Sequence, residues 1–294
     1  MEIKQQKNCK MGVIVDGMDV KNANKAEIDE LKSIIYKHKI VIFKGLNLSS
    51  SEYADLAKKI GEPEAYYEPM YHHPKEKEIF VSSNVSKDGK QIGVPKTGKF
   101  WHVDYAFKER PFAFTLLNQK EVPCSNRGTF FVDMAEAYRT LPSDVQQIIE
   151  NATCQHSVRR YFKIRPTDVY RPLSEVINEV DNKAPPVLHP AVIAHPVTKE
   201  KILYVSEGFT ISIQDENGHD LGDALLQDLF EYSGQRDPSF SHELIHLQTS
   251  QKGDLLIFDN RSLVHCAKHS TTPAAAVSHR ITLHDNYDAY HVAA

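Results

Sequence analysis

The sequence predicts a mainly β fold, a jelly roll or cupin-like barrel that carries helical insertions. Many short strand-like segments are separated by turn residues, which is the pattern of such barrels. The helical patterns are fewer, and they intervene between these strands. A length of 294 residues lies within the range of one large β domain with extra helices. We therefore expect residues 1–294 to form a single domain.

An N-terminal segment of strand, helix, strand and helix is expected to precede the barrel. Residues Met11–Val15 form a short apolar run that favours a strand. Asn24 and Glu27 match a capping box, in which the side chains at the start of a helix satisfy each other's backbone N–H groups. Apolar residues then recur at helical spacing, namely Ile28, Leu31, Ile34 and Ile35.

The second half of this segment repeats the pattern. Residues Lys39–Lys44 form an apolar run typical of a buried strand. Ser49 and Glu52 again match a capping box and predict the start of a second helix. Gly61 and Pro63 are expected to end that helix.

Beyond this segment the chain becomes rich in strands. The predicted strands are Glu78–Ser83, Phe100–Tyr105, Phe112–Gln119, Gly128–Asp133, Ala191–His195, Ile202–Ser206, Glu243–Gln248, Asp254–Asp259, Ser262–His265 and Arg280–His284. Short helices are predicted at Met134–Thr140, Ser143–Asn151 and Asp220–Tyr232. Residues Tyr161–Pro190 contain five prolines and little periodicity. We expect a long substrate loop there, since loops of this length are usually lids or binding loops.

Composition and charge exclude several classes of protein. A hydrophobic content of 41% and a charged content of 25% are those of an ordinary soluble globular protein. The formal net charge of -4 argues against a nucleic acid partner, since phosphate binding needs a basic field. No signal-like apolar core and no membrane-spanning run are found, so we expect no membrane partner and a cytoplasmic location. The four cysteines lack regular spacing and predict free thiols in a reducing compartment.

The pair His102 and Asp104 is the first candidate for metal binding. In the predicted strand, residues two apart face the same side, so an imidazole and a carboxylate can meet one ion. A second histidine, His265, follows a distant predicted strand and would complete a set of two histidines and one carboxylate. That set leaves coordination positions open and is typical of iron(II) oxygenases. The alternatives are a solvated polar pair on a strand and a zinc hydrolase, which can use the same ligand types.

Two further residues stand at informative distances from these candidates. Arg280 lies fifteen residues after His265, and its planar guanidinium can grip a carboxylate through two parallel hydrogen bonds. Thr129 lies twenty-five residues after Asp104, and its hydroxyl could support the same carboxylate. A zinc hydrolase would have no use for them there. The alternatives are a surface ion pair for Arg280 and an ordinary strand residue for Thr129.

Two segments indicate where a substrate binds. Residues 65–74 contain Tyr66, Tyr67 and Tyr71 beside two histidines, a composition suited to lining a small-molecule pocket, although aromatic packing under a loop is the alternative. Residues 159–166 place cations beside aromatics, and alternation would put Tyr161, Lys163 and Arg165 on one side. That side could recognise a substrate carboxylate, or it could be a solvated basic edge.

Two further residues, Cys266 and His269, lie close to His265 in the sequence. His269 is a candidate for supporting the site or contacting the substrate, with plain exposure as the alternative. Cys266 is adjacent to the candidate ligand and is expected to face the opposite side of a strand.

The spacing of His102, Asp104, Thr129, His265 and Arg280 resembles that of the taurine dioxygenase family. The likeness runs from the N-terminal strand and helix to Arg280. It implies a double-stranded β-helix fold, with iron(II) held by the two histidines and the aspartate. It also implies 2-oxoglutarate and dioxygen as co-substrates, with the far carboxylate of 2-oxoglutarate on Arg280 and Thr129.

Other stretches resemble a narrower group, the isonitrile-forming oxygenase/decarboxylases of isonitrile lipopeptide biosynthesis. They are residues 66–73, 78–83, 93–98, 100–105, 111–114 and 163–172. The resemblance implies that a 3-[(carboxymethyl)amino] fatty acid is converted to a 3-isocyano fatty acid. Lys163 would bind a substrate carboxylate, and the pocket would be lined by Tyr66, Tyr67, Tyr71 and Tyr105.

Two alternatives to this function remain open. The first is a hydroxylase or desaturase of another small anionic substrate, such as a sulfonate or an amino acid derivative. The second is a jelly-roll binding protein without enzymatic activity, in which the histidines and aspartate are incidental. The residues alone support a small anionic, amine-bearing substrate, and carrier or synthetase partners belong to the isonitrile hypothesis. The acyl chain length and the oligomeric state are not determined by the sequence.

Overall fold

The computed structural model describes residues 1–6, 10–87, 89–124, 127–269, 274–287 and 290. These residues form two compact units, and each is described by itself. The first unit contains Met1–Lys99, Phe112–Phe131 and His246–Asn286. The second unit contains Phe100–Pro111, Val132–Ile245 and Tyr287–Ala294, within the described residues.

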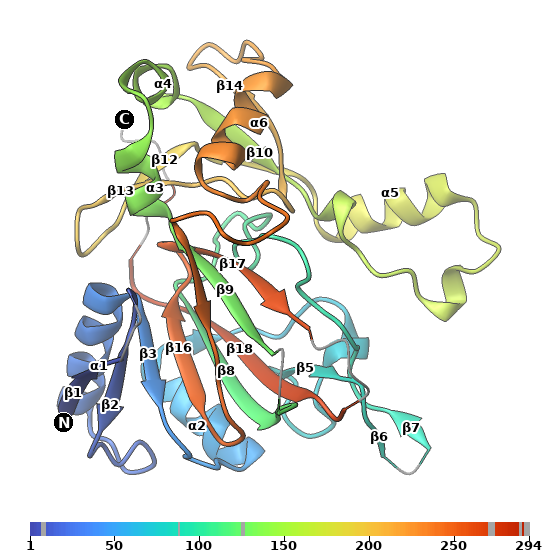
Figure 1. The fold of residues 1–294 in the computed structure, drawn as a ribbon. Coiled ribbons are helices and arrows are strands. Elements are labelled where there is room, and N and C mark those ends of the chain that lie inside the picture. The colour runs from blue at the N-terminus through green and yellow to red at the C-terminus, as the bar shows by residue number, and fades with distance from the viewer. Residues whose placement is uncertain (7–9, 88, 125–126, 270–273, 288–289, 291–294) are drawn as a thin grey trace. The chain divides into compact units, whose positions relative to one another are not determined.

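The largest sheet of the described residues lies in the first unit and contains eight strands (Figure 1). Its order is β1-β2-β3-β16-β8-β18-β4, and β5 pairs with β18. All neighbours are antiparallel except β2 and β3, which are parallel. The strands are β1 Glu2–Gln5, β2 Val13–Asp16, β3 Ile40–Phe43, β4 Glu62–Pro63, β5 Phe80–Ser83, β8 Phe114–Glu121, β16 Leu255–Asp259 and β18 Val277–His284.

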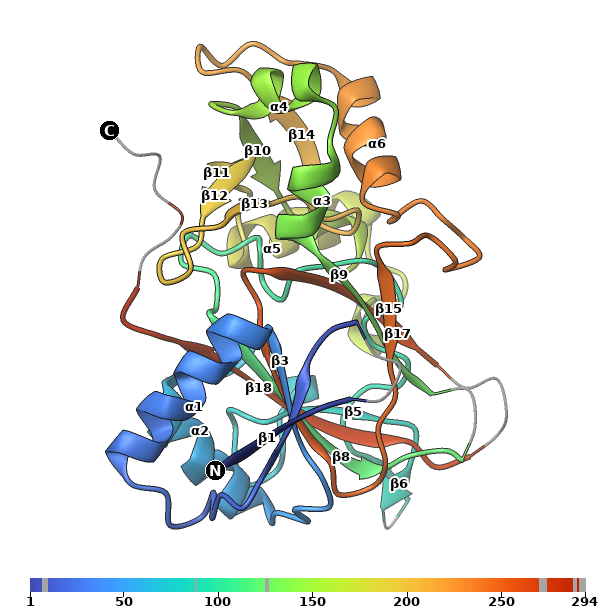
Figure 2. The same ribbon diagram turned by 60° about the vertical axis from the view of Figure 1, so that its left-hand side comes forward.

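Two helices cover one face of this sheet, α1 Lys25–His38 and α2 Ser50–Ile60 (Figure 2). Their apolar side chains share one buried cluster with Val41, Phe43 and Leu255 of the sheet. Burial of each leucine- or isoleucine-sized side chain contributes about 1.5–3 kcal/mol, so this interface holds the helices in place.

Both capping boxes predicted for these helices are confirmed. In α1, the Asn24 side chain accepts from the backbone of Glu27, whose carboxylate accepts from the backbone of Asn24. Ser49 and Glu52 make the same reciprocal pair at the start of α2. Gly61 is the C-terminal cap of α2, as expected.

A three-stranded sheet has the order β15-β9-β17. Side chains of this sheet pack against the face of the large sheet that α1 and α2 do not cover. Its strands are β15 Ile245–Gln248, β9 Gly128–Asp133 and β17 Leu263–Lys268. Phe131 of β9 and Leu263 of β17 share a buried cluster with β3 and β16 side chains that point away from the helices. A side chain at Gly128 would lie 2.7 Å from the carbonyl oxygen of Gln248, so only glycine permits this close strand approach.

The second unit is a mixture of short strands and helices. Its strands form a sheet with the order β11-β10-β14 and a separate pair of β12 with β13. These strands are β10 Thr153–His156, β11 Val187–Pro190, β12 Val192–Ala194, β13 Lys201–Leu203 and β14 Thr210–Gln214. The helices are α3 Met134–Thr140, α4 Ser143–Ile149, α5 Leu173–Lys183 and α6 Asp223–Tyr232. Short elements in the two units complete the list: η1 Pro69–Tyr71, β6 Ser86–Lys87, β7 Lys90–Gln91, η2 Val158–Arg160 and η3 Pro166–Asp168.

The prediction of a strand at Phe100–Tyr105 is wrong. His102 makes a single β-bridge, and a turn begins at Asp104. Tyr105 has a φ of 61°, in the left-handed region that a strand residue does not adopt. Backbone hydrogen bonds from Ala106 to Val103 and from Lys108 to Tyr105 hold this turn.

The prediction that Tyr161–Pro190 is a loop without regular structure is also wrong, because this stretch contains α5 and β11. Leu173, Val176, Ile177 and Val180 recur at helical spacing in α5, although only Val176 is buried. Ion pairs also stabilise the helix, because Glu179 contacts Arg165, Arg171 and Lys183. The strands β1, β10 and β14 were not predicted either, whereas β9 and α3 have the predicted bounds.

The described helices include none that is both long enough and apolar enough to cross a membrane. The cysteines that the structure describes, Cys124, Cys154 and Cys266, are free thiols, and Cys9 lies outside the described residues. The finding agrees with the prediction that no disulfide framework is present, as far as the described residues show.

Candidate functional site

The side chains of His102 and Asp104 are both buried, with 5% and 2% of their surface exposed. His102 Nδ1 lies 2.8 Å from the carbonyl oxygen of Phe100 and donates to it, because a carbonyl can only accept. The proton is therefore fixed on Nδ1, and Nε2 keeps its lone pair. Nε2 lies 3.7 Å from Oδ1 of Asp104. The turn thus brings the two side chains together without the strand that the sequence predicted.

His265 is buried on β17 with 6% of its surface exposed. Its ring packs against Phe131 and Phe258, with ring centroids 5.9 and 5.0 Å away. These aromatic neighbours restrict the ring to one orientation, because a core packed to crystal density leaves little room for another rotamer.

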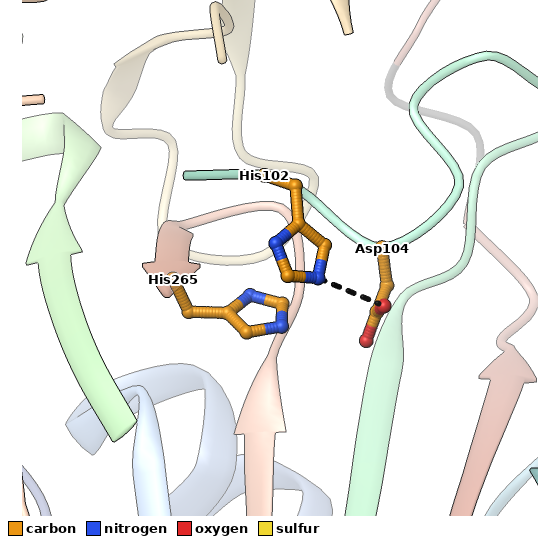
Figure 3. A group of neighbouring side chains, drawn as sticks. All are labelled: His102, Asp104 and His265. Carbon is orange, nitrogen blue, oxygen red and sulfur yellow. Dashed lines mark ion pairs between the residues drawn. The ribbon is translucent and has the colours of Figure 1, made fainter. Parts of the chain in front are cut away.

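One potential ligand atom from each of His102, Asp104 and His265 lies within 4.8 Å of the other two (Figure 3). Two imidazole nitrogens and one carboxylate oxygen are the donor set of mononuclear iron(II) oxygenases, which leave the remaining positions open. The chemistry of these donors therefore fits iron(II).

Arg280 lies on β18 beside an aromatic group of the first unit. The carbon of its guanidinium is 4.1 Å from the ring centroid of Phe80, a cation–π distance. Phe80 stacks on Tyr71 at 4.4 Å, Tyr66 meets Tyr71 at 5.1 Å, and Tyr67 lies 4.4 Å from Tyr66. We call Tyr66, Tyr67, Tyr71 and Phe80 the tyrosine cluster. The structure therefore brings three predicted substrate residues next to the predicted anion-binding arginine.

The hydroxyl of Tyr71 is protonated, since burial raises its pKa well above the usual range. A neutral phenol beside a guanidinium offers hydrogen-bond donors but no charge of its own. The surroundings of Arg280 therefore suit an anionic molecule. Thr129, the residue predicted to assist Arg280, is buried on β9.

A second cationic site surrounds Arg127, to which the sequence assigned no role. Arg127 Nη1 donates to Nδ1 of His269 across 2.6 Å. His269 in turn donates from Nε2 to the carbonyl oxygen of Thr97 at 2.7 Å. The two bonds require a neutral His269, and burial accordingly lowers its pKa to about 4.

Arg127 borders a cavity of about 40 Å³. Among the described residues, its lining also includes Lys96, Ser82 and Asn84 but no aspartate or glutamate. Burial lowers the pKa of Arg127, yet a guanidinium stays charged in proteins. A partly buried cation in such a cavity favours an anion. The sequence signal that could have revealed it is the position of Arg127 two residues before Thr129.

The structure contradicts the shared orientation predicted for Tyr161, Lys163 and Arg165, because the segment is not a strand. Tyr161 stacks on Phe100 at 3.7 Å. Arg165 pairs with Asp168 and Glu179 and so is neutralised by its own chain. Lys163 is exposed. Tyr105 is buried against Phe107, with ring centroids 5.8 Å apart.

Comparison with known proteins identifies relatives along nearly the whole chain. A family model described as "Taurine catabolism dioxygenase TauD, TfdA family" matches residues 3–283. The chain is 26% identical over 284 residues to pentalenolactone F synthase of Streptomyces arenae, covering 93% of this chain and 92% of that protein. It is 27% identical over 290 residues to the alpha-ketoglutarate-dependent 2,4-dichlorophenoxyacetate dioxygenase of Cupriavidus pinatubonensis, covering 92% and 94%.

Solved structures share the fold. The crystal structure of AAD-2 in complex with Mn(II) and N-oxalylglycine matches with a TM-score of 0.74 at 22% identity, covering 97% of this chain and 99% of that one. At this identity the likeness concerns the fold alone. A mainly β architecture of mixed sheets with helices is therefore common to both.

Proposed function

The chain belongs to the TauD, TfdA family of α-ketoglutarate-dependent dioxygenases, whose members use iron(II), 2-oxoglutarate and dioxygen, and we propose that this member forms an isonitrile. Its substrate would be a 3-[(carboxymethyl)amino] fatty acid and its product a 3-isocyano fatty acid. The observation that carries the proposal is the contact of Arg280 with the tyrosine cluster. Residues 66–73, which contain three of that cluster's members, are among the stretches that resemble the isonitrile-forming group.

The proposed iron ligands are His102, Asp104 and His265, on the basis of their donor types and mutual distances. Bound iron(II) would supply the activation of dioxygen that is coupled to decarboxylation of 2-oxoglutarate. The hydrogen bond from His102 to the Phe100 carbonyl keeps Nε2 unprotonated and aimed as a ligand. We further propose that residues 1–294 act as one catalytic domain with a double-stranded β-helix core.

The overall reaction balances with two rounds of oxidation. Each round consumes one dioxygen and one 2-oxoglutarate and releases succinate and carbon dioxide. The first round would hydroxylate the glycine-derived methylene of the substrate. The second would complete the oxidation, with loss of the substrate carboxylate as carbon dioxide and of the remaining hydrogens as water. A four-electron oxidation of the substrate thus requires two succinates per isonitrile.

Two arginines are candidates for the far carboxylate of 2-oxoglutarate. We assign that carboxylate to Arg280, with Thr129 in support, because of the spacing from His265 and the anionic preference of the Arg280 surroundings. Arg127 is the second candidate, favoured by its partial burial beside neutral His269 in a cavity whose described lining contains no acidic residue. If Arg127 holds 2-oxoglutarate, Arg280 becomes the candidate for binding a carboxylate of the substrate.

Substrate contacts are proposed for Tyr66, Tyr67, Tyr71, Tyr105 and His269. Lys163 would bind a substrate carboxylate, and its exposure on the segment before η3 leaves the ammonium accessible. A carrier-bound form of the fatty acid belongs to the same proposal, and so does a synthetase that consumes the product.

Hydroxylation or desaturation of another small anionic substrate is the alternative. It is favoured by relatives whose names include an aryloxyacetate dioxygenase and pentalenolactone F synthase. The further alternative of a non-enzymatic binding protein is contradicted, because the matches to dioxygenases cover more than nine tenths of the chain.

The test uses the full chain with iron(II), ascorbate, 2-oxoglutarate, air and 3-[(carboxymethyl)amino]butanoic acid. Product and succinate are measured by mass spectrometry, with the Asp104→Ala variant as the control for background oxidation. An isonitrile with two succinates per product supports the proposal. Succinate with a product that is only hydroxylated, or with unchanged acid, would retain the dioxygenase and refute isonitrile formation.

A further inference from the structure

A cavity of about 370 Å³ lies in the first unit against β5 and β18. Val81 and Ser83 of β5 line it, together with Val277 and His279 of β18. The register pairs His279 with Val81 and Val277 with Ser83, so these four residues form one continuous patch on one face of the strand pair. Cavities of 300–1,000 Å³ are the size that small-molecule ligands occupy.

This cavity is separate from the surroundings of Arg280. Arg280 pairs with Phe80 in the same register, one residue along from the pair of His279 with Val81. Successive residues of a strand point to opposite faces, and Arg280 accordingly packs on Phe80 while His279 lines the cavity. The strand β18 therefore carries one candidate site on each face.

His279 lines the cavity with unused hydrogen-bonding capacity. Its side chain is buried, with 7% of the residue exposed, and its Nδ1 has no hydrogen-bond partner among the described residues. Burial lowers the pKa of His279 to about 3, so the ring is neutral. A neutral imidazole has one N–H donor and one bare nitrogen acceptor. Buried polar groups are normally bonded, so the ring has hydrogen-bonding capacity that the described residues do not satisfy.

His73, the other histidine at this cavity, differs in that its nitrogens are occupied. Its Nδ1 accepts from the backbone N–H groups of Lys75 at 3.3 Å and Glu76 at 3.2 Å. Its Nε2 lies 3.2 Å from the hydroxyl of Ser50. The His73 ring is 5.3 Å from that of His279 and forms a fixed wall beside it.

The remaining lining defines the kind of molecule that fits. Apolar walls are supplied by Pro74, Val81, Val85, Ile92 and Val277. Lys75 is exposed at the rim. Glu76, Lys75 and Lys120 act on His73, with Glu76 first among them, whereas the charged side chain that acts on His279 is the cation Lys120, beside His73. We propose that this cavity binds a small aliphatic monocarboxylate, whose hydrocarbon packs on the valines and whose carboxylate is held by Lys75 and the imidazole of His279.

The proposal is tested by isothermal titration calorimetry of the full chain with sodium hexanoate. Saturating N-oxalylglycine is present throughout to occupy sites for 2-oxoglutarate. Hexanamide serves as the uncharged probe of the same length. The variants are Ile92→Trp, which fills the cavity, His279→Phe, which removes both nitrogens, and Lys75→Gln, which removes the charge at the rim. His219→Ala, on an exposed turn of the second unit, is the matched control.

We expect hexanoate to bind and hexanamide to bind at least about tenfold more weakly, a difference of about 1.4 kcal/mol. Ile92→Trp and His279→Phe should each weaken hexanoate by tenfold or more, and Lys75→Gln by several-fold, while His219→Ala leaves it unchanged. Both Ile92→Trp and His279→Phe are included because either variant could fail to fold. Circular dichroism detects such a failure. Absence of hexanoate binding at 10 mM, equal affinity in Ile92→Trp, or equal affinity for hexanamide would each overturn the proposal. None of these outcomes depends on iron or on turnover.

Discussion

Arg127 donates a hydrogen bond to His269 across 2.6 Å, and this bond joins a partly buried cation to a neutral imidazole. The other nitrogen of His269 is committed to the Thr97 carbonyl. The first unit therefore contains two arginines in surroundings suited to an anion, Arg127 in a small polar cavity and Arg280 beside the tyrosine cluster. The first question for experiment is which of the two arginines binds 2-oxoglutarate.

Replacing Arg280 with alanine is expected to weaken 2-oxoglutarate binding by about 1.5–3 kcal/mol, the usual contribution of a hydrogen bond to a charged group. The dissociation constant is measured by anaerobic titration of 2-oxoglutarate into protein with iron(II). Arg139→Ala, which removes an exposed ion pair with Glu200, is the control. An unchanged constant in Arg280→Ala together with a weakened one in Arg127→Ala would transfer the role to Arg127.

Substitution of His102 or Asp104 with alanine is expected to abolish iron retention, because two remaining ligands hold a metal poorly. Iron content after desalting is measured by elemental analysis. His219→Ala, an exposed histidine outside the candidate centre, should keep its iron. Full metal occupancy in both the His102 and the Asp104 variants would exclude these residues as ligands.

Lys163→Ala is expected to raise KM for the substrate at least about tenfold, since a lost charge-assisted contact costs about 1.5 kcal/mol or more. Binding of 2-oxoglutarate should not change. Lys183→Ala, on α5 of the same segment and paired with Glu179, is the control. Normal turnover in the Lys163 variant would show that this lysine belongs to a solvated basic edge and does not bind the substrate.

The buried ion pair of Arg261 and Asp285 predicts a large loss of stability. Arg261 donates from both terminal nitrogens to the carboxylate at 2.8 and 2.7 Å, and Tyr36 donates to the same group at 2.7 Å. Arg261→Met should lower the free energy of unfolding by about 3–5 kcal/mol, because it leaves a buried charge unpaired. Urea denaturation measures the change. The double variant Arg261→Met/Asp285→Leu should recover much of the loss, and failure of that recovery would refute the explanation.

The buried His279 predicts a specific pH dependence of stability. Its pKa is about 3 in the folded chain, against an ordinary value near 6.5. Between these values the unfolded chain binds a proton that the folded chain does not, so stability falls as the pH falls from 6.5 to about 3. His279→Phe should flatten this part of the profile of unfolding free energy against pH. His219→Ala is the control, and a profile unaltered in His279→Phe would exclude the effect.

Several local features of the fold could be predicted from the sequence. Both capping boxes are present as expected, and β9 and α3 begin and end at the predicted residues. These signals involve residues at most a few positions apart, so backbone geometry alone relates the pattern to the structure. The identities of the candidate iron ligands also came from spacing, and their role in metal binding remains a prediction.

Two local predictions are wrong, and each has its own reason. The segment around His102 and Asp104 alternates like a strand, but its backbone turns at Asp104. The stretch that contains α5 is rich in prolines and was predicted to be a loop, although Leu173, Val176, Ile177 and Val180 recur there at helical spacing. Alternation in a short segment therefore does not establish a strand, and nearby prolines do not exclude a helix between them.

The sequence by itself determined the family, the donor types available for a metal and the position of most strands and helices. Only the tertiary structure decided that Arg127 meets His269, which lies 142 positions away along the chain. It also decided that His279 lines a cavity while its neighbour Arg280 packs on Phe80. The two residues face opposite sides of β18, and the register with β5 determines which residues each of them meets. Such relationships depend on which strands pair and in which register, and that choice is made by the burial of apolar side chains over the whole unit rather than by any local pattern.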